Sequence, residues 1–146
     1  MFGIRTLVPG FARELARHPG EARAWNGMAC TGLLSLRLRA LVALAVARRV
    51  GGDYAHWAVT RLALQQGIGE EEAFLASLGT AHEPHERAIL RYAVRAVEAV
   101  PEDLDREDEL LRGVHEALAH AVLTCRMLAA LAPERGTMPA QPGART

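Results

Sequence analysis

The chain has 146 residues, of which 50% are hydrophobic and 5% aromatic, and its 17 basic residues, all arginines, balance 17 acidic ones. This length suits one compact domain, and an apolar content of mainly Ala, Leu and Val favours packed helices over sheets. The sequence has no uncharged apolar run of about 18 residues and no signal-type segment, so we expect a cytoplasmic protein without membrane contact. Without lysine or a dense basic run, no nucleic-acid partner is expected either.

Hydrophobic periodicity, caps and breakers predict an all-α, compact multi-helix bundle. One domain is expected over residues 1–132, followed by a flexible tail over 133–146, which is rich in Pro, Gly and small polar residues. Trp25 is interpreted as a packing anchor, and Cys30 and Cys125 as buried free thiols outside any Cys-x-x-Cys pattern. The expected helices cover residues 7–18, 21–28, 36–50, 53–66, 70–78, 84–100 and 114–131.

The third of these helices is expected to be central to the fold. Ser35 is a suitable N-cap, and the run 40–47 contains no polar residue, so most faces of the helix should be covered. Gly51 is predicted to end this helix in the left-handed cap conformation, and Asp53 to cap the next one. The turn between them directs Tyr54, His56 and Trp57 from the first turn of a new helix.

Charge is unevenly distributed along the chain. Residues 1–61 hold nine Arg against three acids (9 − 3 = +6), and the remainder holds eight Arg against fourteen acids (8 − 14 = −6). This division favours association between subunits or attraction of an anionic ligand, or else the charges interleave on the folded surface. Arg37 and Arg39 lie at the positive end of their helix, which indicates either an anion or acidic-partner site or solvated arginines.

Six features occur along the chain in a particular order and spacing: His18-Pro19, Trp25, the segment 36–48, Gly52-Asp53-Tyr54, and the segments 62–72 and 86–93. Their order resembles the carboxymuconolactone decarboxylase and alkylhydroperoxidase D superfamily over roughly residues 18–132. The resemblance implies an all-helical fold, assembly into trimers, hexamers or related rings, and a site near the start of the motif helix.

The redox branch of that superfamily carries a Glu, a Cys-x-x-Cys pair and a following His, which together give a reactive thiolate with a proton relay. Here Arg48 stands in place of the Glu, Gly52 and Ala55 in place of the cysteines, and Ala58 and Val59 where the His would fall. Dithiol peroxidase activity is therefore not expected. The decarboxylase branch lacks the cysteine pair and is the closer match, although its Tyr-Glu-Trp-x-x-His pattern is altered here.

His56 is the candidate acid or base, because imidazole titrates near neutrality and acts without a cofactor. Tyr54 is a candidate hydrogen-bond donor to a developing oxyanion. Arg48 is a candidate for binding the carboxylate of a substrate, and Trp57 for binding the rest of that molecule. Helix-end charge compensation and interface packing are the structural alternatives for these side chains. No cofactor and no metal are assigned. His82 and His85 near the start of one helix are either a weak nitrogen-ligand pair or solvated residues.

Two hypotheses about function follow. The first is a carboxymuconolactone decarboxylase-like lyase that performs non-redox, cofactor-independent acid/base chemistry on a small carboxylate or lactone. The second is a non-catalytic oligomeric scaffold or small-ligand-binding protein that has kept the fold after losing the chemistry. A pocket with His56 pointing into it distinguishes the first from the second.

Overall fold

The computed structural model describes residues 8, 10–30, 32–98 and 109–132, and within these ranges every regular element is a helix. This confirms the prediction of an all-α protein. The ends of two predicted helices and the predicted tail 133–146 lie outside the described residues. The helices are α2 (Phe11–Ala16), α3 (Pro19–Cys30), α4 (Leu36–Gln65), α5 (Glu70–Ser77), α6 (Pro84–Glu98) and α7 (Glu109–Ala130).

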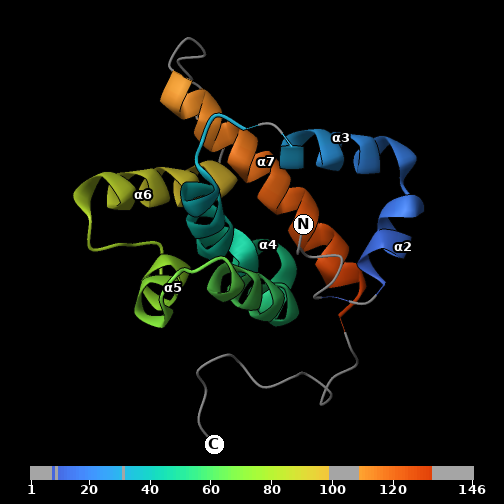
Figure 1. Ribbon diagram of the computed structural model, residues 1–146, viewed down its shortest axis with the longest axis horizontal. Coiled ribbons are helices and arrows are strands. Elements are labelled where there is room, and N and C mark those ends of the chain that lie inside the picture. The colour runs from blue at the N-terminus through green and yellow to red at the C-terminus, as the bar shows by residue number, and fades with distance from the viewer. Residues whose placement is uncertain (1–7, 9, 31, 99–108, 133–146) are drawn as a thin grey trace, which may run out of the picture.

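Helices α4 and α7 form the centre of the molecule, and the remaining helices pack against them in two groups (Figure 1). The first group, α2 and α3, contacts α7. The second group, α5 and α6, contacts α4 from the other side, and α6 also reaches α7. None of the helices in the described residues is long and apolar enough to cross a membrane.

The N-terminal half of α4 is buried as its sequence predicts. The Ser35 hydroxyl accepts a hydrogen bond from the Leu38 amide at 3.2 Å, which confirms the predicted cap. The side chains that follow are enclosed because α4 packs against α7 and against the pair α5 and α6. The buried residues of this half are Leu41, Val42, Leu44, Ala45, Val46 and Ala47.

The two helices predicted on either side of the Gly-Gly turn form one kinked helix. The kink is at Gly52, which has φ 78° and ψ −165°, a region that only glycine enters readily. The prediction that Gly51 takes the left-handed conformation is therefore wrong, because Gly52 supplies the positive φ. Gly51 serves another purpose: a Cβ atom on it would lie 2.6 Å from the Cys125 carbonyl oxygen, so its small size lets α4 and α7 approach closely.

Helix α7 begins earlier than predicted and runs through Gly113. A Cβ on Gly113 would lie 3.1 Å from the Leu33 Cβ and 3.2 Å from the Leu34 side chain. The glycine therefore makes room for the segment before α4 and does not end a helix.

Trp25 lies between α3 and α7. It is 8% exposed, and its indole Nε1 donates to the Thr124 hydroxyl at 2.7 Å. Trp25 is thus confirmed as a packing anchor, between α3 and α7.

Candidate functional site

The predicted site lies at the kink of α4. Arg48 ends the apolar half of the helix, and its Nε atom lies 3.2 Å from a carboxylate oxygen of Asp53. The two side chains are 60% and 74% exposed, so solvent reaches both partners of the ion pair. Arg48 thus spans the Gly-Gly turn and neutralises Asp53. An exposed pair of this kind contributes at most about 1 kcal/mol and separates readily.

Tyr54 and Trp57 form an aromatic stack on the helix after the kink. Their ring centroids are 5.6 Å apart with an interplanar angle of 26°. The guanidinium carbon of Arg61 lies 5.5 Å from the Trp57 ring centroid, within the range of a cation–π contact. The spacing of three and four residues explains this cluster, because such positions share a helix face. Burial raises the pKa of Tyr54, so its phenol stays protonated and able to donate.

His56 is half-buried beside the turn. Its Nδ1 atom is buried and has no hydrogen-bond partner among the described residues. Burial lowers the pKa of His56 below its ordinary value, and the charge of Arg48 lowers it further, whereas Asp53 opposes the shift. The imidazole is therefore neutral near pH 7. A neutral imidazole with an unused nitrogen can accept a proton.

These four side chains do not gather at one point. Successive residues of an α-helix are about 100° apart, so His56 is about 200° around the helix from Tyr54. The Tyr54–Trp57 stack therefore faces one way, and His56 belongs with the electrostatic surroundings of Arg48 and Asp53. The structure divides the predicted site into an aromatic cluster and a charged turn.

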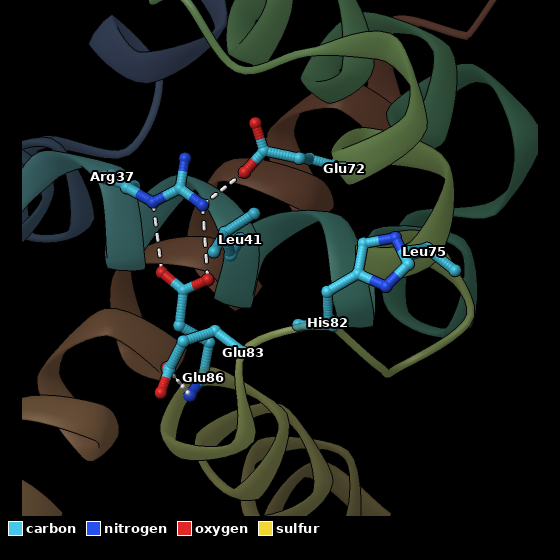
Figure 2. A pocket seen from close by; sticks show the side chains of 8 residues that line it. Arg37, Leu41, Glu72, Leu75, His82, Glu83 and Glu86 are labelled. Carbon is cyan, nitrogen blue, oxygen red and sulfur yellow. Dashed lines mark hydrogen bonds and ion pairs between the residues drawn. The ribbon is translucent and has the colours of Figure 1, made fainter.

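A hollow lies near the start of α4, away from the kink, where this helix meets α5 and α6 (Figure 2). Its volume is about 180 Å³. None of the four predicted site residues is among the described residues that line it. The lining consists of Arg37, Leu41, Glu72, Leu75, Ala81, His82, Glu83 and Glu86.

Arg37 organises one wall of this hollow. Its Nε and Nη2 atoms donate to the two carboxylate oxygens of Glu86 at 3.0 and 3.2 Å, and Nη2 also donates to Glu72. Figure 2 shows the guanidinium between the two carboxylates, which come from α6 and α5. The hydrogen bonds to Glu86 and Glu72 raise the pKa of Arg37, and the same guanidinium lowers the pKa of Glu72. Arg37 is therefore paired with two carboxylates of its own chain, while its side chain stays 45% exposed.

The two histidines near the start of α6 have separate partners. His82 Nε2 lies 3.0 Å from a carboxylate oxygen of Glu71 on α5. The His85 amide donates to Glu83, whose second oxygen accepts from the Glu86 amide at 2.7 Å, so Glu83 caps α6. Among the described residues, no group of three or more His, Cys, Asp and Glu side chains is arranged to hold a metal ion.

His115 and His120 on α7 each lie against an aromatic side chain of another helix. His115 Nε2 lies 2.7 Å from the Tyr92 hydroxyl. His120 lies 5.1 Å from the Trp25 ring, and its Nε2 is buried with no hydrogen-bond partner in the described part of the chain. His115 contacts Tyr92 of α6 and His120 contacts Trp25 of α3, so the two histidines form no common site.

The chain matches no family model, no curated protein and no solved structure. Its chemistry is therefore interpreted from its own geometry. The turn offers a neutral imidazole and an exposed guanidinium, which suit proton transfer and carboxylate binding. The hollow offers a fixed set of charges next to an apolar floor, which suits binding of a small molecule.

Proposed function

We propose that this chain is a carboxymuconolactone decarboxylase-like protein with an alkylhydroperoxidase D-like fold, acting in the cytoplasm by non-redox, cofactor-independent acid/base chemistry on a small carboxylate or lactone. The order of motifs across residues 18–132 supports the family. The single observation that supports the chemistry is the half-buried His56 imidazole, whose lowered pKa keeps it neutral near pH 7.

In this proposal His56 is the proton acceptor. Its pKa is lowered by burial, so the basic form predominates at neutral pH and a proton can be removed from a carbon acid next to a carbonyl group. Arg48 holds the substrate carboxylate. Its present partner Asp53 is 74% exposed, and a second carboxylate can compete for the guanidinium because the exposed pair is weak.

Solvent-deuterium incorporation tests the proposal without knowledge of the final product. A panel of carboxylated butenolides and β-keto acids is incubated with the protein in D2O, and exchange at the carbon next to the carbonyl is followed by proton NMR. Protein-dependent exchange in at least one compound is expected. His56→Gln should lower its rate by about 100-fold or more, because a general base contributes roughly 10²–10⁴ in rate.

The matched control is His85→Gln, which removes an exposed imidazole at the start of α6. This variant should exchange the substrate at the unchanged rate. Arg48→Gln should raise KM more than it lowers kcat, because Arg48 is assigned to binding. Equal rates for His56→Gln and the unmodified protein would remove His56 from the chemistry.

The alternative is a non-catalytic oligomeric scaffold or small-ligand-binding protein. It is favoured by the position of the hollow, which is lined by Arg37 and its partners and not by His56. Phe74 on α5 and Leu78 at its C-cap, four residues apart, are 62% and 61% exposed. Exposed apolar side chains of this size are expected on a face that a further subunit covers. A homo-oligomer, trimer or hexamer, belongs to both proposals.

Light scattering separates the oligomer from the chemistry. A trimer or hexamer is expected for the full chain, and Phe74→Ser should shift it toward monomer. If the panel shows no exchange while the oligomer persists, the scaffold or binding role is preferred over the lyase.

A further inference from the structure

The hollow between α4, α5 and α6 has the features of a binding site separate from the α4 kink. Its floor is apolar: Leu41 is 1% exposed, and Leu75 and Ala81 are half-buried. Its volume of about 180 Å³ lies below the roughly 300–1,000 Å³ of sites for drug-sized ligands. The space therefore suits a molecule smaller than a typical drug-sized ligand.

The charged wall of the hollow is held in place before any ligand arrives. Arg37 binds both oxygens of Glu86 and one oxygen of Glu72, so three helices are joined by one guanidinium (Figure 2). Glu83 is fixed by two backbone amides of α6. Such preorganised groups lose little side-chain entropy when a ligand binds.

The balance of charge around the hollow is negative. Its lining contains one guanidinium and three carboxylates. Two residues beside the lining do not change the sign: Arg87 donates to the carbonyl oxygens of Ala81 and His82, and Glu71 pairs with His82. A carboxylate ligand would add to this excess, whereas a cation would reduce it.

We propose that this hollow binds a small organic cation, an ammonium or guanidinium group carried on a short apolar chain. The apolar chain lies on Leu41, Leu75 and Ala81, and the cationic group donates hydrogen bonds to the carboxylates of Glu83 and Glu86. Each of these carboxylate oxygens already accepts one hydrogen bond and has a second lone pair to offer. A bare metal ion fits less well, because the apolar floor of the hollow offers it no ligand atoms opposite the charged wall.

The charge states of the wall support this ligand class. Hydrogen bonds from the His85 and Glu86 amides lower the pKa of Glu83, and Arg37 lowers the pKa of Glu72. Both groups therefore stay ionised at neutral pH. The site is independent of the acid/base proposal, since its residues differ from those at the α4 kink.

NMR titration of the full-length, ¹⁵N-labelled protein with n-butylammonium tests the inference, with n-butyrate and 1-butanol as matched probes. Saturable shifts of amides in residues 72–87 are expected for n-butylammonium in the millimolar range. Butyrate and butanol, which share the apolar chain, should produce no saturable shifts there. Saturation by butanol alone, or by none of the three probes, would overturn the proposal.

Variants locate the site. Ala81→Leu leaves every charge in place and fills the hollow, so it should abolish saturable binding. Glu86→Gln removes one carboxylate and should weaken binding by roughly tenfold or more. Glu70→Gln is the control, because it removes the same charge from exposed α5 surface outside the lining. If Ala81→Leu still binds n-butylammonium, or if Glu70→Gln weakens binding as much as Glu86→Gln, the cation binds to acidic surface in general and the proposal fails.

Discussion

Gly51 and Cys125 bring the two central helices into close contact. A Cβ atom on Gly51 would lie 2.6 Å from the Cys125 carbonyl oxygen and 3.1 Å from its Cβ. Because the first of these neighbours is backbone, it cannot turn away as a flexible side chain would. The crossing of α4 and α7 therefore depends on the absence of a side chain at residue 51.

Gly51→Ala should destabilise the protein. The added methyl would meet the Cys125 carbonyl oxygen of α7 at 2.6 Å and the Ala55 Cβ of its own helix at 2.5 Å. Helix α4 must therefore move away from α7 and distort locally, at a cost of about 1–3 kcal/mol. Urea unfolding followed by circular dichroism measures the change. Gly27→Ala is the control, because a Cβ there meets nothing within 4 Å among the described residues, and it should stabilise α3 by about 0.5–1 kcal/mol. Equal stability of both variants would show that the helices are not in close contact.

Gly52→Ala should also destabilise the protein, by a different mechanism. A Cβ on Gly52 meets no atom of the described residues within 4 Å, so the cost comes from the backbone at φ 78° and ψ −165°. About 1–3 kcal/mol is expected. Gly52→Asn should not recover this loss, since asparagine favours the left-handed helical region and not this value of ψ. Full stability of Gly52→Asn in urea unfolding would indicate a different conformation at the kink.

His120 should make the protein less stable in acid. Burial, together with the charge of Arg39, lowers the pKa of His120 to about 4, against 6.5 in the unfolded chain. Between these values the unfolded state binds more protons, so stability is highest above pH 6.5 and falls as the pH drops toward 4. The full loss is roughly 3 kcal/mol. Unfolding free energy measured against pH should therefore fall more steeply for the unmodified protein than for His120→Gln.

The control for this pH profile is Gln65→Ala, since Gln65 is exposed and does not titrate. It should leave the pH dependence unchanged. In a Trp57→Phe background, Trp25 fluorescence provides a local readout, because the indole lies against the His120 ring. A His120→Gln profile as steep as that of the unmodified protein would assign the acid sensitivity to other groups.

Arg37→Gln should loosen the junction of α4, α5 and α6. It removes the bridge and leaves Glu72 and Glu86 to repel each other. Because the Arg37 side chain is 45% exposed, solvent screening limits the loss to about 1 kcal/mol. Added salt should narrow the difference from the unmodified protein in urea unfolding. The stability of Arg37→Lys should lie between those of Arg37→Gln and the unmodified protein, since lysine keeps the charge without the forked geometry. Arg23→Gln, on the exposed surface of α3, is the control and should have little effect on stability.

Most of the helices, and the Ser35 cap, were predictable because their signals are local. Ser35 caps α4, Pro84 begins α6 and the apolar run before Arg48 is buried, and each of these depends on residues within a few positions of one another. The burial of Trp25 and Cys125 likewise follows from their apolar character.

The roles of the glycines and of the charged wall depended on the tertiary structure. Gly51 and Gly52 are neighbours with different roles. Gly51 must be small because α7 lies close to it, whereas Gly52 adopts a positive φ. Glu72 and Glu86 come within reach of Arg37 only because α5 and α6 pack against α4 in one register. Sequence spacing determines which residues share a helix face, whereas contacts between helices depend on crossing angle and register, which no local pattern encodes.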